Sequence, residues 1–165
     1  VARPCLRLSS FGSLFHFTPA NKPPGAASRC LDCAEEPTCP YSAVRMYLGA
    51  VRSGKGVSWA RKIVGGAEAT EASVTEALRH GPYGRCVYEC DNDVCDNQVV
   101  SMQFEGGRTA TFTLAAFSKD ICVRSLRVFG THGEIRGDGR DRIELNDFRT
   151  GTSTVIRADG PPPGT

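Results

Sequence analysis

The chain has 165 residues, 40% of them hydrophobic and 23% charged, which suits one globular domain and leaves too little length for two of ordinary size. A formal net charge of +2 gives little attraction for nucleic acid or an anionic membrane, so neither is expected as a partner. No apolar run reaches the roughly 20 residues of a membrane-spanning helix, and the first residues lack a signal peptide's apolar segment, so we expect a cytoplasmic protein.

The first predicted element is a short strand over residues 6–11, where apolar and polar side chains alternate. The proline and glycine residues of 18–30 predict an irregular segment after it. The chain starts with Val1 rather than Met, which is compatible with a start inside a longer polypeptide.

A cysteine-rich loop follows, in which Cys30, Cys33 and Cys39 lie close together. Disulfide scaffolds are typical of secreted chains below about 100 residues, so we expect free thiols in a reducing compartment. Thiolates two residues apart can bind one zinc ion, which takes four ligands at about 2.3 Å. The fourth ligand would come from elsewhere in the chain, with these candidates: Cys5, His16, Cys86, Cys90 and Cys95. The alternative is that the three thiols only pack beneath a proline-rich loop.

Two helices are expected in the first half of the chain. Apolar residues at helical spacing predict the first over residues 41–51, with Pro40 near its start. A glycine-rich break over 52–58 ends it. The second helix is predicted over 70–79, beginning near Thr70 and stopped by the glycine and proline that follow it.

Residues 81–98 are rich in polar side chains and lead directly into predicted strands. Polar groups that converge at the mouth of a sheet suit a substrate pocket. They also suit an ordinary capped loop, in which Asp and Asn side chains accept hydrogen bonds from backbone N–H groups. The residues themselves leave both interpretations open.

Strands dominate from residue 98 onward. Residues 98–117 contain two runs joined at Glu105, Gly106 and Gly107, where glycine supplies the positive φ of a tight hairpin. Four more short strands are predicted between residues 124 and 158, and the proline-rich tail 158–165 is expected to be disordered. Successive strands without long helices between them imply a largely antiparallel sheet. The predicted fold class is therefore α+β.

Several segments resemble a subgroup of the Gfo/Idh/MocA oxidoreductase family, whose members include relatives of glucose-fructose oxidoreductase and inositol dehydrogenase. The segments are "SSFGSLFHF", "RCLDC" with "CPYSAVRMYL", "GPYGRCVYECDNDVCDNQVVSMQFEGG" and "FGTHGEI", in this order between Ser9 and Phe148. Family members join an N-terminal Rossmann domain, which binds NAD or NADP, to a C-terminal α+β domain built on a large open sheet with a few helices on one side.

The resemblance implies that residues 1–157 are a partial C-terminal domain with a cysteine-rich insertion at about 28–40. The Rossmann domain is absent from the sequence, which has no G-x-G-x-x-G turn, no Glu-Lys-Pro segment with the family's catalytic lysine, and no Asp-x-x-x-His motif. We therefore expect no catalytic and no cofactor-binding residue here. The chain alone is expected to transfer no hydride.

The implied function is substrate binding and dimerisation within an NAD(P)-dependent oxidoreductase that acts on a sugar, cyclitol or similar polyol. The partners would be the missing Rossmann domain and a second copy of the chain, which would associate through the sheet face. The expected substrate-binding side chains are Tyr83, Arg85, Asn92, Asp93 and Gln98.

The insertion also bears on the metal hypothesis. Because a plain family sheet does not require this loop, the resemblance favours zinc binding by Cys30, Cys33 and Cys39 over simple packing. Such a zinc would be structural, since hydride transfer needs a base and correct positioning rather than a Lewis acid. An alternative function is a non-enzymatic, zinc-stabilised binding or scaffold module.

Overall fold

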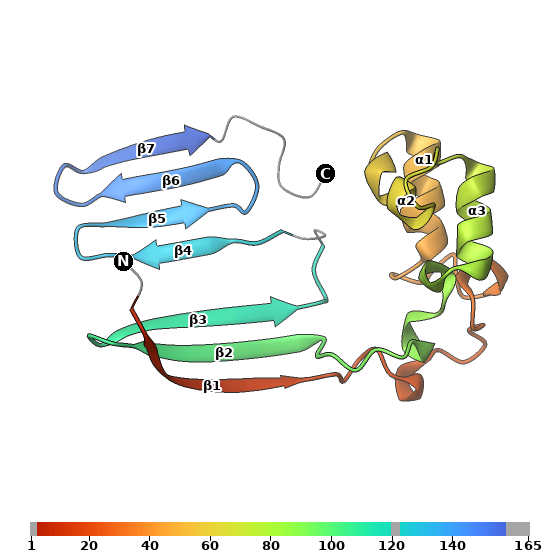
Figure 1. The fold of residues 1–165 in the computed structure, drawn as a ribbon, viewed down its shortest axis with the longest axis horizontal. Helices are drawn as coiled ribbons and strands as arrows, with labels where there is room; N and C mark the ends of the chain where they lie inside the picture. Colours follow the sequence, from red (N-terminus) through yellow and green to blue (C-terminus); the bar gives the residue numbers. More distant parts are fainter. Residues whose placement is uncertain (1–2, 120–122, 158–165) are drawn as a thin grey trace. The chain divides into compact units, whose positions relative to one another are not determined.

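The computed structural model of the chain describes residues 3–119 and 123–157. It contains two compact units, Val1–Phe117 and Ser118–Thr165. The first unit holds a three-stranded sheet and the helices, and the second holds a four-stranded sheet (Figure 1). All strand pairs are antiparallel, so the predicted α+β class is confirmed. Two sheets stand where the sequence predicted one, because alternation identifies strands but not which of their edges hydrogen-bond.

The sheet of the first unit has the order β1-β2-β3. The strands are β1 (Cys5–Ser13), β2 (Asn97–Phe104) and β3 (Arg108–Ala115). A hairpin joins β2 to β3, and both turn glycines, Gly106 and Gly107, have the positive φ that this tight turn requires. The predicted first strand and the predicted hairpin are thus confirmed. The pairing of β1 with β2 connects segments far apart in the sequence.

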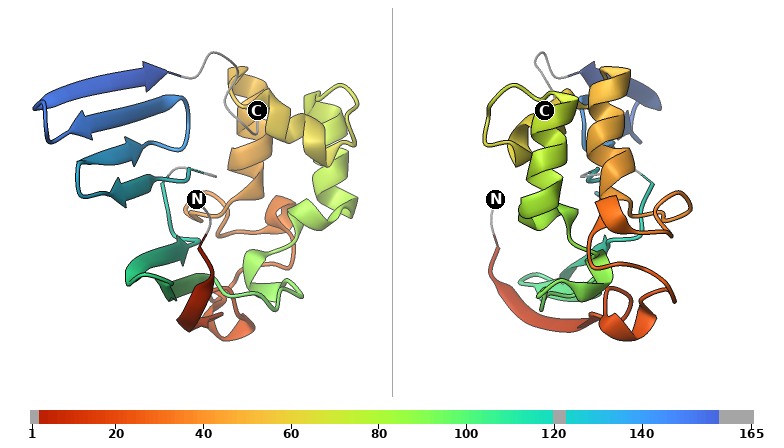
Figure 2. Two further views of the ribbon diagram at one scale, coloured as in Figure 1. Left: turned by 60° about the vertical axis from the view of Figure 1, so that its left-hand side comes forward. Right: turned by 90° about the vertical axis from the view of Figure 1, so that its right-hand side faces the viewer.

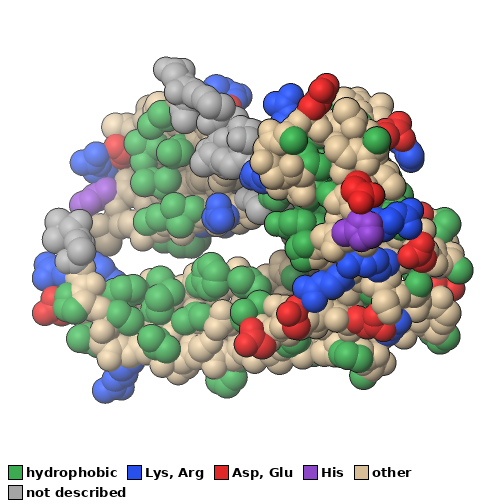
Figure 3. All heavy atoms as spheres, turned by 45° about the vertical axis from the view of Figure 1, so that its right-hand side comes forward, with side chains coloured by type: hydrophobic (Ala, Val, Ile, Leu, Met, Phe, Trp, Pro, Cys, Tyr) green, Lys and Arg blue, Asp and Glu red, His purple; other side chains and the backbone are tan. Residues whose placement is uncertain are grey.

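One face of this sheet is mostly apolar. Residues opposite one another in the register share a face, and these residues carry its apolar side chains: Leu8, Val100, Met102, Ala110, Phe112 and Leu114. Leu8 is 66% exposed and Phe112 is 49% exposed. Figure 3 shows hydrophobic side chains in a row along this sheet. The other face carries mainly serine, threonine and glutamine.

The helices of the first unit lie beyond the ends of the strands, on the side where β1 ends and β2 begins (Figure 1). A π-helical turn, η3 (Val44–Leu48), continues into α1 (Gly49–Ser53). The others are α2 (Val57–Ile63) and α3 (Glu71–His80). Four short 3-10 turns complete the unit: η1 (Pro19–Asn21), η2 (Cys30–Asp32), η4 (Pro82–Gly84) and η5 (Val87–Glu89).

Both predicted helices are confirmed, and α3 begins where the sequence indicated. The Thr70 hydroxyl accepts a hydrogen bond from the Ser73 backbone N–H at 3.1 Å, which completes a capping box with the Ser73 side chain. Helix α2 was not predicted. Its seven residues follow two left-handed glycines, Gly54 and Gly56, and are too few to show a helical period.

The core of the first unit lies among these helices. The segment η3–α1 and helix α3 run alongside each other (Figure 2). Their buried side chains pack with those of α2, and the buried cluster consists of Ala43, Tyr47, Leu48, Ala60, Val74 and Leu78. Among the described residues no helix combines the length and the apolar character needed to cross a membrane.

The second unit is a meander of four antiparallel strands in sequence order. They are β4 (Leu126–Phe129), β5 (Gly133–Gly137), β6 (Arg142–Asp147) and β7 (Thr152–Arg157). The four short strands predicted for this part of the sequence are therefore confirmed. The tail 158–165, for which disorder was predicted, lies outside the described residues.

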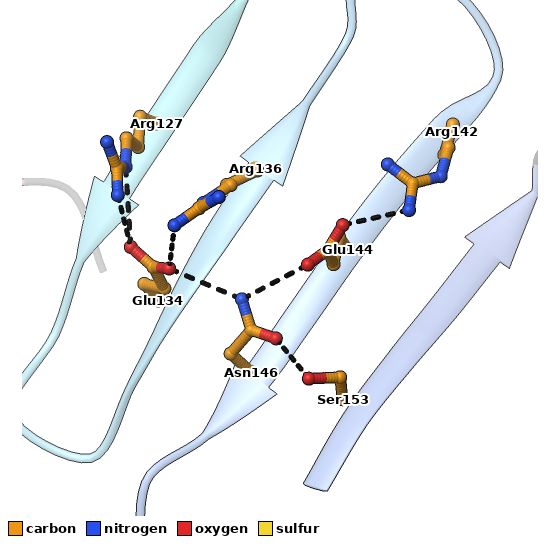
Figure 4. Close-up of polar contacts among 7 residues, drawn as sticks. All are labelled: Arg127, Glu134, Arg136, Arg142, Glu144, Asn146 and Ser153. Atoms are coloured by element: carbon orange, nitrogen blue, oxygen red, sulfur yellow. Dashed lines mark hydrogen bonds and ion pairs between the residues drawn. The ribbon is translucent and has the colours of Figure 1, made fainter.

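One face of the second sheet carries a network of charged side chains. Glu134 lies between Arg127 and Arg136, whose guanidinium groups contact its carboxylate at 3.0 Å and 2.6 Å (Figure 4). The Asn146 side chain donates to Glu134 and to Glu144 on the neighbouring strand. The hydrogen bond from Arg127 is the main cause that lowers the pKa of Glu134. These contacts give the face a fixed polar surface.

The opposite face of the second sheet is apolar. The register places on it Leu126, Val128, Ile135, Ile143, Leu145 and Ile156. Most of these side chains are exposed, with values of 44% for Ile143 and 49% for Ile156. Each sheet thus has one polar and one apolar face, the pattern of an antiparallel sheet that packs against another surface.

Candidate functional site

The cysteine-rich loop consists of consecutive tight turns. The backbone N–H of Cys33 donates to the carbonyl of Cys30 at 3.4 Å, which closes the 3-10 turn η2. Further along, the N–H of Cys39 donates to the carbonyl of Glu35 at 3.0 Å. These turns keep three thiols within one short stretch of backbone. The seven described cysteines are all free.

A fourth cysteine is brought to this loop by backbone pairing. Arg29 and Arg85 form an isolated antiparallel bridge, and the N–H of Cys86 donates to the carbonyl of Ser28 at 2.8 Å. Cys86 therefore lies beside the start of the loop although it is far from it in sequence. Its side chain is 9% exposed. Because long-range pairing creates this proximity, cysteine spacing alone could not select Cys86.

The thiols surround a single small cavity of about 30 Å³. Four cysteines line it, namely Cys30, Cys33, Cys39 and Cys86. The side chains of Tyr41 and Tyr88 and the loop carboxylates Glu35 and Glu36 also contribute to its wall. Across residues 3–119 and 123–157, no three His, Cys, Asp or Glu side chains already have the arrangement of a bound metal ion.

The cavity environment acts on the ionisation of its thiols. Burial raises the pKa of Cys30 above its ordinary value, and the nearby thiols of Cys39, Cys86 and Cys33 raise it further. The backbone N–H of Ala43 donates to the Cys30 sulfur and opposes this rise. The thiol of Cys30 therefore stays protonated at neutral pH unless a cation replaces its proton.

Next to the cavity wall lies a cluster of aromatic side chains around His16, of which Tyr88 is buried and the others are partly exposed. The His16 Nε2 atom lies 3.1 Å from the Tyr41 hydroxyl and 3.3 Å from the Tyr88 hydroxyl. The rings of Phe17 and Phe117 pack against it, with centroids 5.0 Å and 5.2 Å from that of the imidazole. Two tyrosines thus contact both the cysteine cavity and this histidine. The sequence offered His16 as one candidate for a fourth zinc ligand, but His16 does not line the cysteine cavity.

Asp96 fixes the backbone that carries this histidine. It is 3% exposed, and its carboxylate accepts hydrogen bonds from the N–H groups of Phe15, His16 and Phe17. Burial acts to raise the pKa of Asp96, but these bonds and one from the Asn97 side chain outweigh it and lower the pKa to about 2. Sequence reasoning placed Asp96 in a polar segment without assigning this role. The capped-loop interpretation describes it correctly.

The expected substrate residues lie in separate local contacts. Tyr83 is half-exposed, and its ring packs edge-on against Tyr47 with centroids 6.0 Å apart. The guanidinium of Arg85 pairs with Asp91 at 2.8 Å, whereas its Nε atom is buried without a hydrogen-bond partner.

The remaining three follow the same pattern. The Asn92 side chain accepts from the N–H of Val94, the Asp93 side chain is exposed, and the Gln98 amide donates to the Ser10 hydroxyl at 2.9 Å. In the part of the chain that the structure describes, no hydrogen bond or ion pair joins any two of the five expected substrate residues. None of them lines the cysteine cavity.

Comparisons of the chain with protein families, with curated proteins and with solved structures give no match.

Proposed function

We propose that this chain is the substrate-binding and dimerisation portion of an NAD(P)-dependent oxidoreductase of the Gfo/Idh/MocA type, acting on a sugar, cyclitol or similar polyol. The α+β class and the antiparallel pairing of every strand agree with the family's C-terminal domain, although that domain has one large open sheet and this chain has two smaller ones. The observation that carries most weight is the exposed apolar face of the β4–β7 sheet. Contiguous exposed apolar faces are typical of association surfaces.

The described residues do not fit a dinucleotide. Such a cofactor binds where a strand leads through a glycine-rich turn into a helix N-terminus. The glycine-rich segment here, Gly54 to Gly56, joins α1 to α2 and follows no strand. The cofactor would therefore be held by a Rossmann domain, and this chain would contribute contacts to the polyol. The cytoplasm, where nicotinamide cofactors are abundant, is the proposed location.

Polyol contacts are assigned to the segment that holds Tyr83, Arg85, Asn92, Asp93 and Gln98. The support is the combination of an exposed tyrosine, an exposed carboxylate and a guanidinium within one irregular segment. Hydroxyl groups of a polyol can donate to a carboxylate and accept from a guanidinium.

Titration of the chain with inositol, glucose, NAD and NADP, followed by NMR of the backbone amides, tests this assignment. We expect shifts confined to residues 83–98 with the polyols, and no shift with either nucleotide. Polyol shifts elsewhere in the chain would contradict the assigned segment. Micromolar binding of NAD or NADP would show that the chain holds the cofactor itself. Assigning cofactor binding to a separate Rossmann domain would then be wrong.

A zinc-stabilised binding or scaffold module is the second candidate. The specific observation in its favour is the cavity lined by four thiols, which an oxidoreductase sheet does not need. This candidate predicts zinc without any polyol binding.

A further inference from the structure

We propose that Cys30, Cys33, Cys39 and Cys86 are the four ligands of a structural zinc ion, with Cys86 as the ligand that cysteine spacing could not identify. The zinc site is independent of the oxidoreductase proposal, which rests on the sequence resemblance and on the sheets. A negative result here would remove the zinc site and leave that proposal in place.

The four thiols are selected by position, because all of them line the same cavity. The cavity volume of about 30 Å³ exceeds the roughly 10–15 Å³ that one water molecule needs, so a bare zinc ion fits. Cys30 is within electrostatic reach of the other three. The two turns of the loop and the hydrogen bond from Cys86 to Ser28 hold all four backbones around this point.

The other described cysteines have different surroundings. Cys5 is exposed on β1, and its thiol donates to the carbonyl of Arg7. The Cys90 thiol donates to the carbonyl of Cys86 at 3.3 Å, and the Cys95 sulfur lies 3.7 Å from the Gln98 side-chain oxygen. None of these three lines the cavity. The structure therefore separates four candidate ligands from three thiols that are not candidates.

Neighbouring groups could stabilise the negative charge of a zinc ion bound by four thiolates. Zinc with four thiolates carries a net charge of −2, which needs nearby donors or cations. The Ala43 N–H donates to the Cys30 sulfur, and the ammonium group of Lys22 lies within electrostatic reach of Cys33 and Cys86. Lys22 also pairs with Glu89, which holds the ammonium in place and takes up part of its charge.

The chemistry is an exchange of protons for metal. Four neutral thiols release four protons as four zinc–sulfur bonds form, with no change in oxidation state. Four thiolates leave no open position for water or substrate, so the ion would be structural. A tetrahedral site needs sulfur atoms about 3.8 Å apart for bonds of about 2.3 Å. The thiols would reach this spacing by side-chain rotation and rearrangement of the loop.

The proposed consequence is a metal cross-link between the cysteine-rich loop and the segment at Cys86 in the first unit. Without metal, the loop is joined to the segment before β2 by the Arg29–Arg85 bridge and a few hydrogen bonds. With zinc, the loop, the segment at Cys86 and the start of η3 would be fixed together. Because the unfolded chain lacks a preformed site, the free energy of metal binding would add to folding stability.

The test begins with the zinc content and the X-ray absorption spectrum of the whole chain purified without added chelator. We expect one zinc per chain with four sulfur neighbours at about 2.3 Å. Zinc content far below one per chain after reconstitution under reducing conditions would overturn the proposal. A shell that mixes sulfur with oxygen would also overturn it and would indicate Glu35 or Glu36 as a ligand.

Two matched variants then identify the fourth ligand. Cys86→Ser should weaken zinc affinity by about 100-fold or more, measured by competition with a chromophoric chelator. Cys90→Ser is the control, because Cys90 lies four residues away and does not line the cavity, and its affinity should stay within about threefold of the parent. Equal losses in both variants, or an unchanged affinity in Cys86→Ser, would contradict the assignment. If Cys86→Ser does not fold, the X-ray absorption spectrum of the parent chain still tests the proposal, because four sulfur neighbours require a fourth cysteine ligand.

Discussion

Self-association through the apolar face of the second sheet can be tested with two neighbouring residues of β7. Ile156 lies on the apolar face opposite Ile143, and Val155 lies on the charged face opposite Glu144. Their exposed fractions are almost equal, 49% and 47%. Changing each to alanine therefore removes a similar exposed aliphatic group from opposite faces of the same strand.

The expected size of the effect follows from this exposure. Burying a whole isoleucine side chain is worth roughly 1.5–3 kcal/mol. Ile156 is 49% exposed, so burying this exposed half in an interface contributes about 1 kcal/mol per copy. A two-fold interface contains the residue twice, so Ile156→Ala should cost about 2 kcal/mol, or roughly a 30-fold increase in Kd.

Sedimentation equilibrium over a dilution series is the appropriate assay. We expect the parent chain to dimerise at micromolar concentrations, Ile156→Ala to dissociate at higher concentration, and Val155→Ala to match the parent within about threefold. A monodisperse monomer without binding of an apolar dye would refute the association surface. Equal weakening by both variants would show that the interface is not confined to the apolar face.

Three further predictions concern stability. Leu78→Ala should lower the free energy of unfolding by about 2–5 kcal/mol in denaturant titrations, because Leu78 is fully buried, whereas Leu8→Ala on the exposed face of the first sheet should change it by less than about 1 kcal/mol. Gly84→Ala should cost roughly 3 kcal/mol in the same assay, since the new Cβ would lie 1.8 Å from the Leu78 carbonyl oxygen; an unchanged midpoint would mean that the turn after α3 can shift freely. The pKa of Asp96 is lowered from 3.8 to about 2, so its contribution to stability is present above about pH 4 and is lost as the pH falls toward 2. Asp96→Asn should therefore show a flatter melting-temperature profile than the parent between pH 4 and pH 2, and identical profiles would mean that the carboxylate does not support the backbone at His16.

The elements of this fold that could be predicted are those with local causes. Gly106 and Gly107 identify the β2–β3 hairpin because the turn requires positive φ. Thr70 identifies the start of α3 because its hydroxyl accepts from the first turn of the helix. Strands β4 to β7 could be predicted because apolar and polar residues alternate in the short runs between turns. In each case the information lies within a few residues.

The features that could not be predicted depend on long-range pairing. The strand pattern does not determine that β3 and β4 belong to different sheets, because alternation identifies strands but not the edges that hydrogen-bond to each other. Cys86 joins the cysteine loop through the bridge of Arg29 with Arg85, which has no signature in the spacing of cysteines. His16 likewise contacts Tyr41 and Tyr88, which are distant from it in the sequence. Three of the four proposed zinc ligands could therefore be named from the sequence, and Cys86 could not be selected.

We propose that this chain works together with a nucleotide-binding domain in a polyol oxidoreductase. Sequencing the transcript upstream of the Val1 codon tests it most directly. We predict an open reading frame in phase with Val1 that encodes a strand, a G-x-G-x-x-G turn and a helix, followed by a Glu-Lys-Pro segment. A start codon directly before Val1, preceded by an in-frame stop codon, would contradict the claim and favour the zinc-stabilised module.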